Sequence, residues 1–266
     1  MDGSIPLIIS FGLTIGLALG LTGGGGSIFA VPLLIYGLGM DVHQAVGVSL
    51  AAVGATAAFG ALTRWHSGQL EFRTGLLFAG AGMLGTPLGT RIGISLPPAA
   101  TLSAFALLMI VVGLRMWRQS PSPARAAVPP PSCTRDDAGT LRWSSRCALV
   151  LVLAGLLTGV LSGVFGVGGG FIIVPALILT SRMAIHRAVG TSLLIIALIC
   201  LSGVLSYLAQ GSPLPATTTL IFVLGGLLGM LGGTRLATRL NGPTLNRVFA
   251  TGMWLVASFV LLRTLL

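Results

Sequence analysis

The most regular feature of the chain is a series of apolar runs, each about as long as a lipid bilayer is thick. A transmembrane helix needs about 20 mostly apolar residues. Four runs in the first half of the chain and four in the second reach that length, at residues 5–22, 45–64, 75–94, 99–117, 147–165, 188–208, 217–234 and 248–264. This pattern predicts an all-α, polytopic membrane protein.

Two shorter apolar segments, 27–38 and 171–181, each follow a cluster of glycines. A single helix over residues 5–38 would be about 50 Å long, whereas the hydrocarbon core of a bilayer is about 30 Å thick. Four consecutive glycines followed by Pro32 also oppose a continuous helix. We therefore expect two broken hairpins, in each of which a long helix is followed by a shorter limb that spans only part of the bilayer.

The two glycine clusters belong to an internal repeat. Residues 16–50 align with residues 159–193 without a gap, and nearly half of the aligned positions are identical. Each half then holds four long helices and one short, glycine-broken helix. An odd number of segments inverts the second half relative to the first. Inverted repeats around broken helices are typical of transporters that build one binding site from two halves.

The repeat divides the chain into three parts. Residues 1–118 form the first transmembrane repeat, residues 119–146 form a polar linker rich in Pro, Ser and Arg, and residues 147–266 form the second repeat. We expect the linker to be poorly ordered and, because of its arginines, cytoplasmic. This orientation places Arg64 and Arg73 inside and leaves Arg91 and Arg263 outside, against the general rule.

Composition supports a membrane location. Only 8% of the residues are charged and 54% are hydrophobic, whereas a water-soluble domain has about a quarter charged residues. The net charge of +10 would indicate nucleic acid in a soluble protein, but here the basic residues lie between apolar runs and instead set membrane orientation. We expect a multi-pass protein of the cell inner (plasma) membrane that binds no nucleic acid.

The glycine clusters are the first candidate site. Where a helix restarts after Gly26, the amides of Ser27 and the next residues have no partner within the helix, and the helix dipole adds positive charge there. Such an end binds anions without a charged side chain. The alternative is that these glycines only permit close helix packing. The candidate substrate-binding residues of the two clusters are Gly23, Gly25, Gly26, Ser27, Gly166, Gly168, Gly169 and Gly170.

Hydroxyl groups follow each hairpin, in the repeated motifs AVGVSL at 45–50 and AVGTSL at 188–193. Ser49, Thr191 and Ser192 are candidate hydrogen-bond donors to an oxyanion. The alternative is that each hydroxyl bonds to a carbonyl of its own helix, as is common in apolar helices.

Two further pairs repeat between the halves. Arg91 and Arg235 each follow a threonine, and they either attract or gate the substrate or anchor a helix end at the membrane interface. His43 and His186 also match. They suit proton transfer, but we interpret them as helix-start or interface polar groups.

The chain lacks the residues that most catalytic and cation-coupled sites require. Its five acidic residues all lie outside the spanning runs, and a buried carboxylate is the usual mark of a proton relay. There is no GxSxG or HExxH motif, and the three cysteines show no metal-ligand spacing. We expect no enzymatic activity, no metal and no cofactor.

The doubled glycine-rich break ending in VP, the AVGxSL motif after it and the late GxxxGTR resemble the sulfite exporter TauE/SafE family of integral membrane proteins. The resemblance covers both halves. It implies export or uptake of small sulfur-containing anions such as sulfite, thiosulfate or organosulfonates, and it places the family's glycine motif on Gly23, Gly25, Gly26, Gly166, Gly168 and Gly169. One departure is the run of four glycines in the first half, where the second half has Val167.

The sequence therefore predicts an anion transporter whose partners are a small anionic substrate and membrane lipid. Export is the direction that we favour. It leaves open whether the chain forms a homodimer. Two alternatives remain at this point: a membrane-embedded enzyme that uses Cys200 or the histidines, and a membrane subunit that only scaffolds a partner.

Overall fold

The structure is a computed structural model that describes residues 5–65, 68, 70–118, 134–135, 141–142, 145–181, 183, 185–212, 214–237 and 242–265. Most of the predicted linker lies outside these residues. The first half consists of α1 (Ile5–Thr22), η1 (Gly25–Phe29), α2 (Ala30–Pro32), η2 (Leu33–Gly37), α3 (Val42–Trp65), α4 (Phe72–Ser95) and α5 (Pro98–Arg118). The second consists of α6 (Ser145–Phe165), α7 (Gly170–Ser181), α8 (Ile185–Ala209), α9 (Ala216–Ala237) and α10 (Gly242–Leu265).

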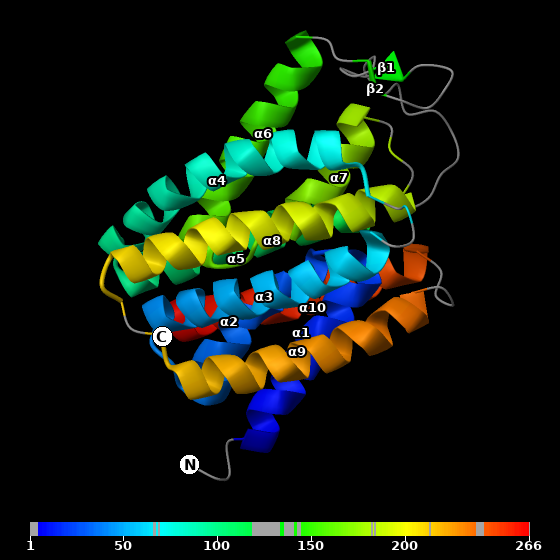
Figure 1. The fold of residues 1–266 in the computed structure, drawn as a ribbon. Coiled ribbons are helices and arrows are strands. Elements are labelled where there is room, and N and C mark those ends of the chain that lie inside the picture. Colours follow the sequence, from blue (N-terminus) through cyan, green and yellow to red (C-terminus); the bar gives the residue numbers. More distant parts are fainter. Residues whose placement is uncertain are drawn as a thin grey trace.

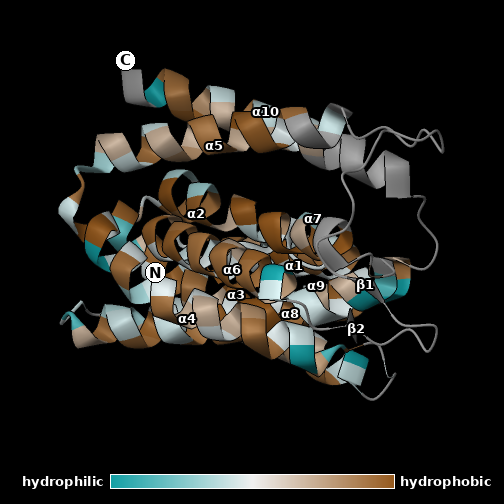
Figure 2. Ribbon diagram, turned by 90° about the horizontal axis from the view of Figure 1, so that it is seen from above, coloured by the Kyte–Doolittle hydropathy of each residue, from teal (hydrophilic) through white to brown (hydrophobic). Residues whose placement is uncertain are grey.

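The all-α prediction is confirmed, since every predicted apolar run lies in a helix. Two short strands, β1 (Thr134–Arg135) and β2 (Leu141–Arg142), pair antiparallel between the halves. Among the described residues, five helices are long and apolar enough to cross a membrane by length and hydropathy alone. These five are α1, α3, α6, α8 and α9. Figure 2 shows hydrophobic residues along the helices and hydrophilic ones mostly near their ends.

The helix α4 shows why an apolar surface can face outward here. Its side chains Leu76, Leu84 and Leu88 point away from the protein, and Leu84 is 73% exposed. Two repeat equivalents on α9, Leu220 and Leu228, are exposed in the same way, at 63% and 60%. Large exposed apolar stripes are costly in water, so these faces are the surface that lipid covers.

The two halves interlock, because each long helix packs mainly on a helix of the other half. The pairs are α1 with α9, α6 with α4, α3 with α8, and α5 with α10. In Figure 1 the helices α4, α8, α3 and α9 lie one below another, and α1 and α6 cross them at an angle. Figure 2 shows α5 and α10 side by side along one edge.

Repeated glycines hold α1 on α9. A Cβ on Gly12 would meet the carbonyl of Phe222, one on Gly16 would meet Gly226, and one on Gly20 would lie 2.9 Å from the carbonyl of Met230. The two helices therefore run in the same direction with their backbones in contact, as small residues one turn apart allow in membranes.

The second half repeats this arrangement between α6 and α4. Gly155, Gly159 and Gly163 of α6 contact the α4 backbone in the same order, at Phe78, Gly82 and Thr86. These glycines are the repeat equivalents of Gly12, Gly16 and Gly20.

The equivalent helices α3 and α8 cross antiparallel at the centre. Gly47 lies at Tyr207, Gly54 at Cys200 and Gly60 at Leu193, so positions rise in one helix as they fall in the other. Two inverted halves require this arrangement; the orientation of each half relative to a bilayer stays a prediction.

The glycine stripes predict a clear stability difference. Gly16→Val should lower the free energy of unfolding by about 1–3 kcal/mol, the usual cost of forcing volume into a packed site. Gly80→Ala on the exposed face of α4 is the control, since a Cβ there meets no atom within 4 Å, and it should be neutral or stabilising by up to about 1 kcal/mol. Thermal unfolding of the detergent-solubilised variants measures both. Equal unfolding temperatures would show that the α1–α9 contact is not tight.

Candidate functional site

The predicted helix breaks are present in both halves. After α1, Gly23 and Gly24 have φ angles of +73° and +147°, and after α6, Gly166, Gly168 and Gly169 have φ angles of +70°, +69° and +70°. Residues with side chains rarely adopt these angles, so glycine is required at the turns. We call residues 23–26 the first tip and residues 166–170 the second tip.

The first short limb begins earlier than expected. The 3-10 helix η1 starts at Gly25, and the amide of Ser27 donates to the carbonyl of Gly24 at 3.3 Å. The prediction of an unpartnered Ser27 amide is therefore wrong, because the flexible glycines already form the first turn. The Ser27 hydroxyl also donates to the Gly24 carbonyl, at 2.7 Å. In the described part of the chain, Gly24, Gly25 and Gly26 donate no backbone hydrogen bond.

The second tip has the same character. The helix α7 begins at Gly170, and the Gly169 carbonyl accepts from the amides of Ile172 and Ile173, at 3.0 and 3.2 Å. Within the described residues, Gly168, Gly169 and Gly170 donate no backbone hydrogen bond. All the residues of both tips are buried.

The two tips contact each other, backbone on backbone. A Cβ on Gly24 would lie 2.6 Å from the Cα of Gly170, and a Cβ on Gly170 would collide with the Cα of Gly24. The side chain of Ile196, at the centre of α8, lies against both glycines. The two glycine clusters are therefore brought together, around the crossing of α3 and α8, by Gly170 and by Gly24, which was not among the predicted site residues.

The serine hydroxyls of the repeated AVGxSL motif donate hydrogen bonds to carbonyls of the opposite half, and not only to carbonyls of their own helix. Ser49 donates to the carbonyl of Gly166 at 2.6 Å, and Ser192 donates to the carbonyl of Gly23, also at 2.6 Å. Ser192 is also within 2.8 Å of the Val189 carbonyl. Both serines are fully buried. A hydroxyl has a single proton, so in this conformation neither serine has one left for an oxyanion.

The valines of the same motif cover the same glycines. A Cβ on Gly23 would lie 2.5 Å from Cγ1 of Val189, and a Cβ on Gly166 would lie 2.8 Å from Cα of Val46. Val46 and Val189 are repeat equivalents. Each motif thus holds the first glycine of the opposite tip with one valine and one serine, a role that the sequence alone did not reveal.

Thr191 lies away from the tips. Its hydroxyl oxygen accepts the amide of Glu71 at 3.1 Å, and the Glu71 carboxylate accepts the hydroxyl of Thr74 at 2.6 Å. Thr191 therefore contacts the start of α4, and its role in binding substrate stays a prediction.

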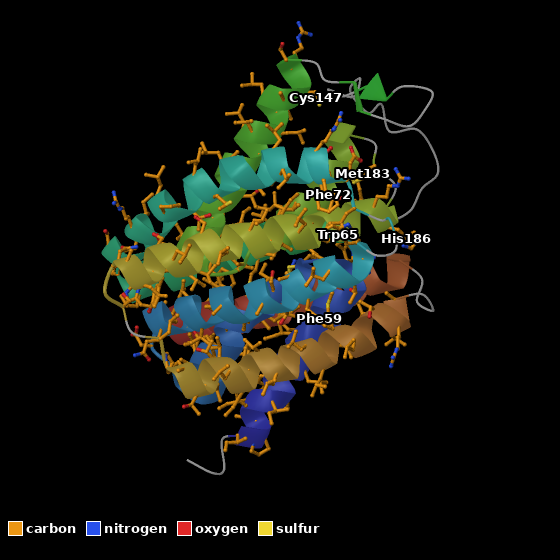
Figure 3. All side chains as sticks on the ribbon, viewed as in Figure 1. Phe59, Trp65, Phe72, Cys147, Met183 and His186 are labelled. Carbon is orange, nitrogen blue, oxygen red and sulfur yellow. The ribbon has the colours of Figure 1, made fainter. Side chains whose placement is uncertain are left out.

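The charged candidates lie at the periphery. Arg91 and Arg235 are both exposed, which fits the interface-anchor interpretation better than direct substrate contact. His186 is exposed at the start of α8, and Figure 3 shows it at the same end of the molecule as Trp65 and Phe72. Among the described residues, no group of three or more His, Cys, Asp or Glu side chains could hold a metal ion.

Apolar helices, two similar interlocked halves and buried helix breaks that meet at the centre define a multi-pass membrane protein. The family model for sulfite exporter TauE/SafE matches residues 8–260, and the chain belongs to this family of membrane transporters. The resemblance seen in the sequence is confirmed, and the chain is a transporter rather than an enzyme.

Relatives cover nearly the whole chain. A "Probable membrane transporter protein" of Xylella fastidiosa (strain 9a5c) is 39% identical over 264 residues, 98% of this chain and 96% of the relative. One from Haemophilus influenzae is 29% identical, over 95% of this chain and 96% of the relative. The "Probable membrane transporter protein YdhB" of Bacillus subtilis is 27% identical, over 77% of this chain and 79% of the relative. No solved structure matches the chain.

The backbone angles of the tips predict a difference between two glycines of one motif. Gly168→Ala should lower the unfolding temperature by several degrees, because φ is +69° and the new Cβ lies 3.0 Å from Ile196; a left-handed residue with a side chain costs about 1–2 kcal/mol. Gly25→Ala should be close to wild type, since its Cβ meets only Thr22, at 3.2 Å. A scan of both variants in detergent tests this, and an equal loss at Gly25 would contradict it.

Proposed function

We propose that the chain exports small sulfur-containing oxyanions, such as sulfite, thiosulfate or organosulfonates, across the cell inner membrane. The observation that carries the proposal is the contact of the two tips at Gly24 and Gly170. It gathers the unpaired amides of two helix starts in one buried place, and such amides bind anions.

Neutral donors suit an anion that must leave again. A buried arginine would hold the substrate through charge-assisted hydrogen bonds, which are about twice as strong as neutral ones. At the tips, the amides of Gly25, Gly26 and Gly168–Gly170 offer several weaker hydrogen bonds instead. The helix dipoles add partial positive charge at the start of α7 and of the limb formed by η1, α2 and η2.

The membrane potential supplies the direction. Moving one negative charge outward through 100 mV is worth about 2.3 kcal/mol, which is roughly a 50-fold concentration ratio at equilibrium. The acidic residues of the described helices lie at helix ends: Glu71 precedes α4 and Asp41 precedes α3. We therefore propose export driven by potential, without a coupled proton.

Reconstituted protein tests the driving force. Proteoliposomes loaded with sulfite should release it faster when the potential is set negative inside, and reversing the potential should slow release. Empty liposomes and liposomes with heat-inactivated protein control for passive leak. A flux that is unaffected by potential would contradict potential-driven export, and no flux above the controls for any anion tested would contradict transport by this chain alone.

A substitution that removes a single amide tests the tips. Gly25→Pro removes one N–H at the first position of η1, where proline costs a helix no internal hydrogen bond. Gly25→Ala is the matched control, because it adds a side chain and keeps the amide. We expect the proline variant to raise the apparent KM for sulfite at least several-fold relative to the alanine variant, in line with the loss of one hydrogen bond.

The unfolding temperature of both variants in detergent must be measured alongside, since proline also restricts Gly24. If the proline variant is folded and transports with the KM of the alanine variant, the amide of Gly25 does not bind the anion.

A further inference from the structure

A small cavity lies beside the second tip, where α3 begins and α8 ends. Its volume is about 10 Å³, room for about one water molecule. Residues with polar side chains from four elements line it: His43 near the start of α3, Thr90 on α4, Thr101 on α5 and Tyr207 on α8. The charged neighbours Asp41 and Arg91 are exposed and do not line it.

The wall of the cavity is connected to the exposed end of α8. The hydroxyls of Thr90 and Ser206 are 2.6 Å apart, and the amide nitrogen of Gln210 donates to the Thr90 hydroxyl at 3.2 Å. Gln210 is exposed just after α8. The polar chain from Gln210 to Thr90 therefore runs from water toward the interior.

One turn of α3 separates the cavity from the second tip. Val46 lines the cavity and also packs on Gly166. Ser49, in the same turn, holds the Gly166 carbonyl at 2.6 Å. If this hydrogen bond opens and the turn moves away from Gly166, the cavity and the tip join.

The equivalent bond lies at the other end of the same helix pair. Ser192 binds Gly23, and its neighbour Leu193 lies against Gly60 of α3. Ser49 and Gly60 are eleven residues apart, so the two serine bonds are about 17 Å apart along the pair at about 1.5 Å per residue. They hold opposite ends of the same central contact between the tips.

We propose that the cavity at Thr90, Thr101 and Tyr207 is one mouth of the transport route for a small oxyanion, and that Ser49 closes it. The Ser49–Gly166 bond is the latch of this mouth, and the Ser192–Gly23 bond is the latch of the opposite mouth. The anion reaches the tips when one latch opens while the other stays closed. This inference rests on the proposed function, because the route is defined by the tips as the binding site.

We expect substitutions of the two serines to have opposite effects on the accessibility of a cysteine in the cavity. Thr101→Cys places a thiol on the cavity wall, at a residue only 4% exposed in this conformation. Its labelling rate by a water-soluble methanethiosulfonate reagent then reports how often the mouth is open. Adding Ser49→Ala should raise the rate about fivefold, the ratio that corresponds to one buried hydrogen bond of about 1 kcal/mol. Adding Ser192→Ala should lower the rate, because it favours the state open at the other end.

Ser202→Ala is the matched control. This serine is partly buried and, like the two tip serines, donates across the halves, to the carbonyl of Met83 at 2.9 Å, but it contacts neither tip. It should leave the labelling rate unchanged. Protein without Thr101→Cys gives the background from the native cysteines, and the unfolding temperature of each variant shows that the fold is kept.

The latch is overturned if both tip serines shift the rate in the same direction, if neither shifts it, or if Ser202→Ala shifts it as much as Ser49→Ala. Labelling needs no substrate, so its outcome is separate from that of sulfite flux. If the two serine variants change the labelling rate in opposite directions but no anion gives a flux, the latch proposal is supported and the proposed substrate is rejected. Flux with an unchanged labelling pattern would keep the function and reject the latch.

Discussion

A backbone that breaks inside a membrane protein must find partners for its polar groups without water, and this constraint explains the centre of the structure. One carbonyl at each break is satisfied from the opposite half, because Ser192 binds the carbonyl of Gly23 and Ser49 binds that of Gly166. The amide of Gly23 still bonds to Leu19, whereas in the described part of the chain the amides of Gly25, Gly26 and Gly168–Gly170 donate no backbone hydrogen bond. Unpaired amides are the groups that a helix start offers to an anion, and this is the basis of the proposed function.

The same two bonds make each half depend on the other. Every long helix has its main partner in the other half. The tip of each half is held by the AVGxSL motif of the other half, on α3 or α8. A half alone would expose the glycine stripes of α1 or α6 and leave its tip carbonyl unsatisfied. The two repeats are therefore similar in sequence and related by symmetry, but only the interlocked pair forms a complete packed core.

The sequence predicted correctly those features that depend on residues close together in the chain. Chain length, apolar runs and glycine clusters predicted the helices and both breaks, because membrane thickness and backbone angles act on neighbouring residues. It was wrong about the Ser27 amide, since the glycines before it already form a turn. It did not reveal the partners of Ser49 and Ser192, which lie 117 and 169 positions away. The motif showed that these serines repeat, but only the crossing of α3 and α8 brings each one to the opposite tip.

The departure from symmetry in the sequence falls where the tips meet. Gly24 and Gly170 contact each other, and their repeat equivalents are Val167 and Ser27, which are too large for a second contact of this kind. Val167 instead packs in the apolar cluster that holds Phe105 and Phe165, and Ser27 turns its hydroxyl onto Gly24. Two identical halves would hold the two latches with equal strength, leaving the two access states equal in free energy. In the proposed mechanism, the unequal pair of positions at this contact would remove that equality, next to the amides that we propose bind the substrate.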